Sequence, residues 1–183
     1  MRLKDLLPTR RNRLEAKARA IQRQTVRKIE KKKETISQQN KKRKQNIDKE
    51  FIQEIQDTYS AINHIAIPLK KCTGKSFQDQ KVFVQQSEFA INTAFAHIHS
   101  LVYICNSSQL SEHITNQDAL KKTKKITDKF YEIIQQLLHS MKASIDKKDE
   151  DGLKRTIVSL ADCFEEIKTT LEDIIEDQNS ATP

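Results

Sequence analysis

Residues 150–177 read EDGLKRTIVSLADCFEEIKTTLEDIIED, and this stretch decides the fold. Its large apolar residues recur alternately four and three positions apart. They are Leu153, Ile157, Leu160, Phe164, Ile167, Leu171 and Ile174. This spacing keeps side chains on one side of an α-helix and fills the a and d positions of three heptads. We therefore predict an amphipathic helix over 150–177, with its apolar face against other helices and its acidic residues facing outward.

Three more segments show a helical apolar stripe, at 47–67, 77–105 and 118–147. The stripes consist of Ile47, Phe51, Ile55, Ile62 and Ile65; of Val84, Ile91, Phe95, Ile98, Val102 and Cys105; and of Leu120, Ile126, Phe130, Ile133, Leu137, Met141 and Ile145. Pro68 is expected to end the first of them, because proline lacks a backbone donor and clashes with the preceding turn. Four such helices with short links predict an antiparallel four-helix bundle.

Upstream of the bundle, no residue from Arg10 onward would break a helix before Pro68. The whole chain has only two glycines and three prolines, too few turn formers for a β-rich protein. The fold class predicted is therefore all-α, an antiparallel four-helix bundle preceded by a long basic N-terminal helix. The predicted parts are a basic arm at 1–46, the helical bundle at 47–178 and a disordered tail at 179–183.

Charge is divided unevenly along the 183 residues. Residues 1–50 carry 18 Lys and Arg against 6 Asp and Glu, whereas the whole chain has a net charge of +8. The rest of the chain is therefore net acidic. Such asymmetry indicates contact with nucleic acid, with an anionic membrane or with an acidic protein surface.

The basic runs are the candidate site for anionic-surface binding. Its residues are Arg10, Arg11, Arg13, Lys31, Lys32, Lys33, Lys41, Lys42, Arg43 and Lys44. Clustered cations bind phosphates by releasing counterions, and anionic leaflets attract nearby Lys and Arg. The first 50 residues contain no aromatic residue, which disfavours sequence-specific reading of bases. The sparse aliphatic stripe of the same helix also fits a coiled-coil seam for a partner helix or for self-association. The choice among these partners stays open.

The sequence favours no catalytic or metal-binding role. Cys72, Cys105 and Cys163 form no CxxC pair, which disfavours both a disulfide framework and zinc. Cys72 falls in a predicted loop at 69–76 beside lysines, where a lowered thiol pKa is conceivable. In the same loop, Thr73-Gly74-Lys75-Ser76 resembles the end of a phosphate-binding loop, but neither the upstream glycine nor a preceding strand is present. We expect no enzyme activity, no cofactor and no small-molecule substrate.

The acidic end of the chain suggests two further hypotheses. Net charge over 149–178 is −7, from three Lys or Arg against ten Asp or Glu, so this face could fold back onto the basic arm and mask it. The glutamate-rich end, Phe164-Glu165-Glu166 to Ile175-Glu176-Asp177, is similar to the export signals of some bacterial type IV secretion effectors. That resemblance implies secretion into a host cell and action on host partners.

The leading hypothesis is a non-enzymatic helical interaction protein that docks to an anionic surface, either membrane phospholipid or a nucleic-acid backbone, through its basic N-terminal helix. A coiled-coil assembly or adaptor protein is the alternative from another class, beside the secreted effector. No apolar run is long enough to span a bilayer or to form a secretory signal, so we expect a cytoplasmic or peripheral membrane location.

Overall fold

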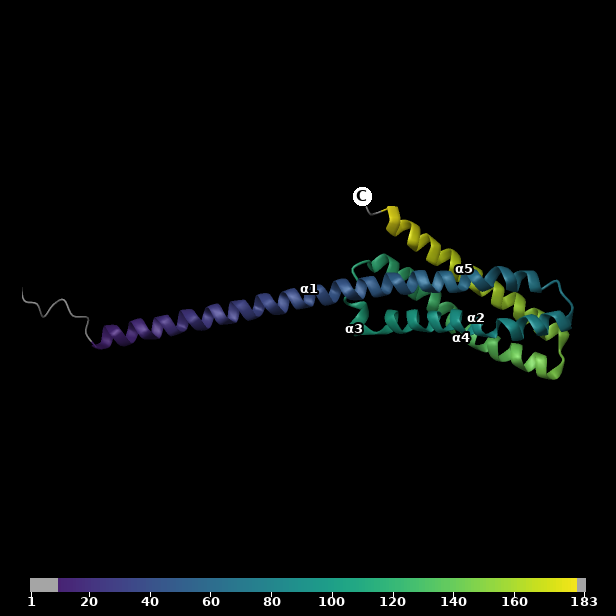
Figure 1. Ribbon diagram of the computed structural model, residues 1–183, viewed down its shortest axis with the longest axis horizontal. Coiled ribbons are helices and arrows are strands. Elements are labelled where there is room, and N and C mark those ends of the chain that lie inside the picture. The colour runs from purple at the N-terminus through teal and green to yellow at the C-terminus, as the bar shows by residue number, and fades with distance from the viewer. Residues whose placement is uncertain (1–9, 181–183) are drawn as a thin grey trace, which may run out of the picture. The chain divides into compact units, whose positions relative to one another are not determined.

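The computed structural model describes the backbone of residues 10–180, with the side chains of Lys31, of residues 33–35 and of residues 37–180. This part of the chain consists of α1 (Arg10–Cys72), α2 (Phe77–Asn106), α3 (Ser108–Ser111), α4 (Gln117–Lys147) and α5 (Glu150–Ser180) (Figure 1). No β-strand occurs between residues 10 and 180, so the prediction of an all-α protein is confirmed.

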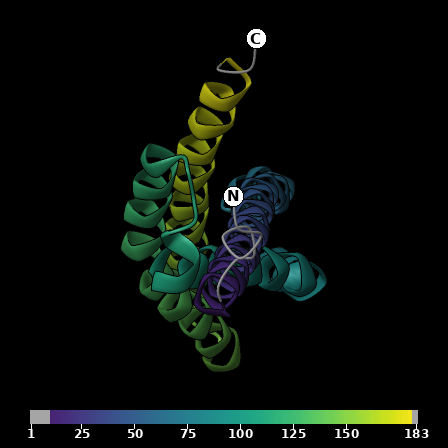
Figure 2. The ribbon, with the colours of Figure 1, turned by 90° about the vertical axis from the view of Figure 1, so that its left-hand side faces the viewer.

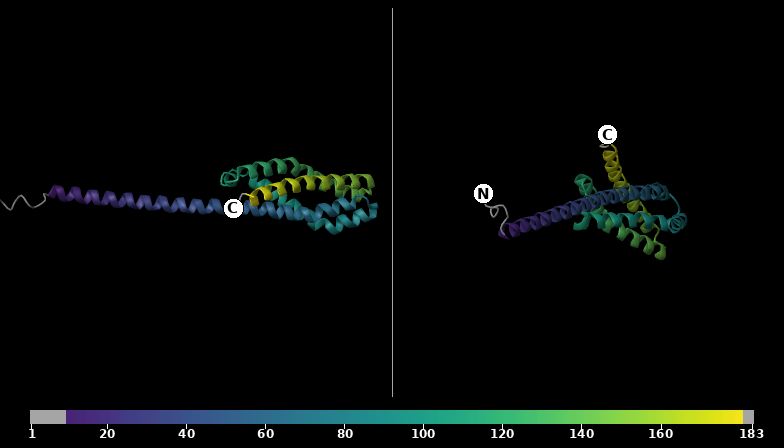
Figure 3. Two further views of the ribbon diagram at one scale, coloured as in Figure 1. Left: turned by 90° about the horizontal axis from the view of Figure 1, so that it is seen from above. Right: turned by 60° about the vertical axis from the view of Figure 1, so that its left-hand side comes forward.

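The chain divides into two units between residues 45 and 46, and α1 contributes to both. The second unit is a helical bundle, in which the last part of α1 is followed by α2, α4 and α5. The chain reverses direction between α1 and α2, around the single turn of α3, and between α4 and α5 (Figure 3). The view along the helices shows α5 beside α4 (Figure 2).

The predicted seam of α5 forms the centre of the core. All seven of its predicted apolar residues are fully buried, and the predicted core residues of the last part of α1 are buried as well. Burying one such side chain stabilises the fold by about 1.5–3 kcal/mol relative to leaving it in water. The heptad prediction for 150–177 is therefore confirmed residue by residue.

Polar contacts fix the last part of α1 against the rest of the bundle. The Tyr59 hydroxyl donates to Glu172 on α5 at 2.9 Å, and this hydrogen bond is the main reason that the pKa of Tyr59 is raised. Glu54 pairs with His97 Nδ1 on α2 at 2.8 Å. Asp48 accepts from the backbone N–H of Thr115 at 2.7 Å. These contacts orient α1 toward three different parts of the bundle.

The predicted end of the first helix at Ile67 is wrong, because α1 continues through Pro68 to Cys72. Pro68 removes only one hydrogen bond close to the helix end, where few bonds follow it. Leu69 and Cys72 are buried in the core, and their burial favours a last helical turn over the loop that we predicted. The loop is reduced to residues 73–76, and the side chain of Gln80 holds it. Gln80 Nε2 donates to the backbone carbonyls of Cys72, Thr73 and Lys75.

The predicted stripe of α4 needs one correction, since Ile134 is fully buried and Ile133 is 43% exposed. The true stripe passes through Thr123 and Thr127, two buried residues whose polar type hid them from the periodicity analysis. The Thr127 hydroxyl donates to the carbonyl of Thr123 at 2.9 Å, which allows its burial. With threonines on the stripe, the register shifts by one position to Ile134.

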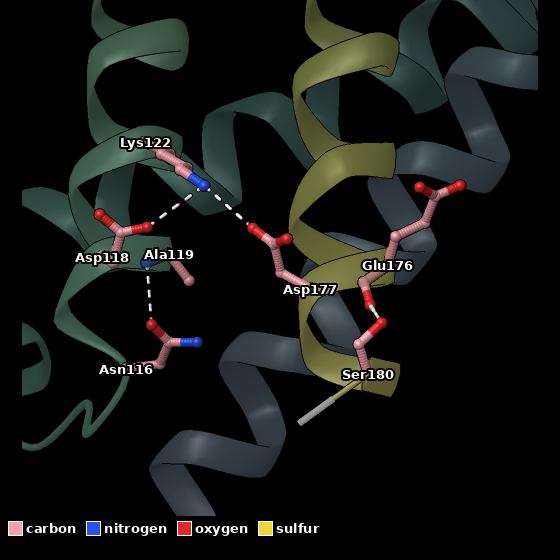
Figure 4. A network of polar contacts seen from close by, with 7 residues as sticks. All are labelled: Asn116, Asp118, Ala119, Lys122, Glu176, Asp177 and Ser180. Carbon is pink, nitrogen blue, oxygen red and sulfur yellow. Dashed lines mark hydrogen bonds and ion pairs between the residues drawn. The ribbon is translucent and has the colours of Figure 1, made fainter. Parts of the chain in front are cut away.

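Side-chain caps define the helix ends of the bundle. Ser76 accepts from the N–H of Asp79 at the start of α2, and Asn116 accepts from the N–H of Ala119 at the start of α4 (Figure 4). Figure 4 also shows Lys122 between Asp118 of its own helix and Asp177 of α5, at 3.2 and 3.0 Å. Hydrogen bonds to these two carboxylates raise the pKa of Lys122.

The C-terminal end of α5 overlaps the predicted disordered tail. The helix reaches Ser180, whose hydroxyl donates to the carbonyl of Glu176 at 3.0 Å (Figure 4). Residues 181–183, the remainder of that predicted tail, lie outside the described residues.

The register of α4 predicts unequal effects of two adjacent substitutions. Ile134→Ala should lower the free energy of unfolding by about 2–5 kcal/mol, because it removes buried methylenes and leaves a cavity. Ile133→Ala, the matched control one residue away, should lower it by less than about 1 kcal/mol. Urea unfolding followed by helical circular dichroism measures both. Equal losses for the two variants would contradict the register.

Gly152, near the start of α5, should tolerate alanine poorly. Asp149 Oδ1 accepts from the N–H of Gly152 at 2.9 Å, and a Cβ at position 152 would lie 2.1 Å from Asp149 Oδ2. Gly152→Ala should therefore displace the cap and cost about 1 kcal/mol, although alanine ordinarily stabilises a helix relative to glycine. Asp149→Ala should cost about as much, and the double variant little more, because both changes remove the same hydrogen bond. A Gly152→Ala variant as stable as the wild-type protein would contradict the predicted clash with Asp149.

Candidate functional site

The basic segment, defined here as residues 31–45 of α1, is the part of the predicted site whose side chains are largely described. Its sequence KKKETISQQNKKRKQ has seven cations and one acid, Glu34. The six cations with described side chains are all exposed: Lys31, Lys33, Lys41, Lys42, Arg43 and Lys44. The other predicted site residues, Arg10, Arg11, Arg13 and Lys32, belong to the same helix, and their side chains lie outside the description.

Cations occupy every side of the basic segment. Successive residues of an α-helix are rotated by about 100°, so Lys41 to Lys44 together span about 300° of the circumference. Lys31 and Lys42 are eleven residues apart, close to three full turns, and share one side. Because the charge surrounds the helix, a flat surface can contact only part of it at once.

One side of the basic segment combines lysines with neutral polar groups. A shallow depression there is lined by Lys33, Ser37, Asn40, Lys41 and Lys44. These residues offer ammonium, hydroxyl and amide donors along about three turns of helix, and all three groups can bond phosphate oxygens. Ser37 and Asn40 lie outside the basic runs that the sequence marks as the candidate site. Their spacing of four and seven residues from Lys33 is the signal that finds them.

The charge of the basic segment is not neutralised by the side chains described around it. None of its six described cations forms an ion pair within the described part of the chain. Lysines of the bundle behave differently. Lys129 pairs with Glu166 at 2.5 Å, and Lys142 pairs with Glu88 at 3.2 Å. The six described cations of the basic segment therefore have their positive charge available for an external anion.

The segment offers almost no apolar surface. Ile36 is the only apolar residue between Lys31 and Gln45, and the described side chains around it are all polar or charged. A helix that lies in a membrane interface buries a continuous apolar face among the acyl chains. Across the described helices, none combines the length and the hydropathy that a membrane span would need.

The acidic face of α5 pairs within the bundle. Glu166 and Asp177 bind lysines of α4, Glu165 binds Lys168 of its own helix, and Glu172 accepts from Tyr59. The hydrogen bond to Glu165 is the main reason that the pKa of Lys168 is raised. These contacts give the acidic residues a role in joining α5 to its neighbours. Masking of the basic arm by this face stays a hypothesis.

The loop and cysteine interpretations need correction. Cys72 does not lie in a loop; it is buried in the last turn of α1, and burial raises the pKa of its thiol despite the nearby Lys75. Burial likewise raises the pKa of Cys105 to about 12 and raises that of Cys163. Ser76 serves as the cap of α2. All three cysteines are free thiols with no activated character.

Two of the five histidines make structural contacts. His97 pairs with Glu54, and the ring of His99 stacks on Tyr131 at 5.5 Å between centroids. Within the described residues no three His, Cys, Asp or Glu side chains gather in a way that could hold a metal ion.

Comparison with known proteins gives no relative. No family model, no curated protein and no solved structure matches the chain.

The buried cysteines predict slow thiol labelling. At pH 8 a disulfide reagent should modify the native protein at least about tenfold more slowly than the urea-unfolded protein, since the thiolate is the reactive species.

The pKa of Cys105 is higher in the folded state, about 12, than its ordinary value of 9.0. Its contribution to stability is therefore intact below pH 9 and is lost as the pH rises toward 12. Rapid labelling of the native protein at pH 8 would contradict the burial of the three thiols.

Proposed function

We propose that this chain is a non-enzymatic interaction protein whose basic segment docks to a polyanion, in the first place a nucleic-acid backbone. In this proposal the second unit is an antiparallel four-helix bundle that serves as the scaffold. The observation that carries the proposal is the arrangement of exposed, unpaired cations on all sides of one helix. A helix of this kind is stabilised when phosphates neutralise its self-repulsion.

The distribution of charge favours a groove over a plane. A helix with its side chains is about 10–12 Å across, and the major groove of B-DNA is about 12 Å wide. A helix in that groove has phosphates on both flanks, so Lys33 and Lys41 on one side and Lys31 and Lys42 on the other can bind at the same time. A bilayer would reach only one of these sides.

The composition of the segment favours backbone contacts over other partners. The absence of aromatic residues from the first 50 positions argues for binding without base stacking. A single isoleucine between Lys31 and Gln45 gives too thin a seam for stable coiled-coil pairing through this segment. The same scarcity weakens insertion into a membrane surface. The following experiment separates the membrane alternative from DNA binding.

The decisive variant replaces Lys41, Lys42, Arg43 and Lys44 by glutamine. Wild-type protein should bind random-sequence duplex DNA with an affinity that falls steeply between 50 and 200 mM salt. The variant should bind at least about tenfold more weakly. Its plot of log K against log salt should be less steep by about 3–4 in magnitude, because each lost phosphate contact removes about 0.9 from the steepness. Fluorescence anisotropy with labelled DNA measures both quantities.

A matched control removes the same charge elsewhere. Lys121, Lys124, Lys125 and Lys154 are exposed residues of the bundle, and their replacement by glutamine lowers net charge by the same four units. This control should keep most of the salt dependence of the wild-type protein. The proposal fails if control and variant lose DNA affinity equally, or if neither loses affinity. Anionic vesicles tested in parallel should bind more weakly than DNA, and tighter vesicle binding would favour the membrane alternative.

A further inference from the structure

Helix α2 is almost uncharged in a chain of which 32% is charged. Its 30 residues include only three ionised side chains, Asp79, Lys81 and Glu88. From Phe89 to Asn106 there is none, although six residues of that stretch are exposed. Depletion of charge with retention of aromatic residues is the compositional mark of the centre of a protein interface.

The exposed side of α2 carries an apolar stripe at heptad spacing. Val82, Phe89, Ala96 and Tyr103 follow one another at intervals of seven residues, and all four are exposed. Phe89 is 84% exposed and Tyr103 is 64% exposed, which makes them the two most exposed large hydrophobic side chains among those described. The heptad interval keeps the stripe aligned along about 30 Å of helix. We name these four residues the α2 stripe.

Neutral polar residues flank the α2 stripe on both sides. One flank consists of Gln85, Asn92 and His99, and the other of Gln86, Thr93 and Ser100. Gln85 and Asn92 also line a groove between α2 and α4, next to the ion pair of Glu88 and Lys142. Side chains of this kind can hydrogen-bond a partner without the cost of burying a charge. A helix fits this surface better than a loop, because the stripe is straight and periodic.

The order of side-chain sizes along the stripe indicates which helix fits. In an antiparallel pair of identical α2 helices related by a two-fold axis between residues 92 and 93, residue numbers that face each other sum to 185. Phe89 then faces Ala96 of the second copy, and Tyr103 faces Val82. Each large side chain meets a smaller one, which is the arrangement that lets two helices interdigitate. No like charges meet, although the molecule as a whole is strongly positive.

We propose that the α2 stripe is the self-association surface of this protein, and that a second copy covers it in an antiparallel, two-fold arrangement. Phe89 is the central anchor, and it is held in the small space above Ala96 of the second copy. The surface belongs entirely to α2, so it is separate in sequence from the basic segment. The inference does not depend on polyanion binding.

Sedimentation velocity of the full chain over a range of concentrations tests the proposal. Wild-type protein should shift from monomer to dimer as concentration rises. Phe89→Glu should raise the dimer dissociation constant at least about tenfold, because it places a charge at the anchor. The helical circular dichroism of this variant should be unchanged, since residue 89 lies in solvent in the single chain. Val158→Glu, a charge at an exposed hydrophobic residue of α5, is the matched control and should dimerise like wild type.

A size swap tests the register itself. Ala96→Phe should weaken the dimer, because two phenylalanines then face each other, whereas a merely adhesive apolar surface would associate more strongly with the extra ring. The double variant Phe89→Ala with Ala96→Phe should restore the dimer, because it exchanges the large and small partners. A wild-type protein that stays monomeric overturns the proposal, as does a dimer insensitive to Phe89→Glu. Failure of the double variant to recover overturns the antiparallel register.

Discussion

Burial of the α5 seam against the other helices is the constraint on which the rest of the structure depends. Each bundle helix has one apolar side and cannot hide it alone, so the helices are stable only together. Phe164 and Leu160 lie at the centre of this shared core, and Phe51 and Ile55 bring the last part of α1 into it. The contacts of Tyr59 with Glu172 and of Glu54 with His97 then fix how that helix is rotated. A folded core of this kind allows the remaining surfaces to specialise.

Two surfaces of opposite character result. The basic segment concentrates positive charge that no described side chain neutralises, while α2 presents an exposed side with hardly any charge. The basic segment would attract a polyanion over a long range, whereas the exposed side of α2 would bind a complementary helix by short-range packing. In the bundle, by contrast, Lys122 and Lys129 of α4 pair with carboxylates of α5. A dimer with two basic segments would bind a long polyanion more tightly than a monomer through multivalency.

The sequence predicts most of the fold because hydrophobic periodicity is a local signal. The α5 seam is visible in 28 consecutive residues, and all seven large residues that it selects are buried. The errors arise where tertiary packing overrides a local rule. Pro68 should end a helix, but burial of Leu69 and Cys72 carries α1 past it. Thr123 and Thr127 look like surface residues, and their burial in the core shifts the stripe of α4 by one residue.

The candidate sites were predictable to different degrees. Runs of lysine are evident at once, whereas the grouping of Ser37 and Asn40 with three lysines appears only when the helical spacing of four and seven residues from Lys33 is considered. The α2 stripe escaped the sequence analysis for a different reason. Two apolar stripes run along α2, and only burial reveals that the one containing Ile91 and Ile98 faces the core while the one containing Phe89 does not.

The connection between α1 and α2 is held by backbone hydrogen bonds and by one buried side-chain amide. Gln80 Nε2 serves three backbone carbonyls, those of Cys72, Thr73 and Lys75, and the side chain is buried. Deamidation to glutamate would replace this donor by an oxygen that cannot donate when ionised, and would place it against three acceptors. A mass change of one unit would thus remove the side-chain contribution to the loop and leave its backbone bonds and the Ser76 cap to hold it. Chemical ageing of this one amide therefore weakens the link between α1 and α2 without any cleavage of the chain.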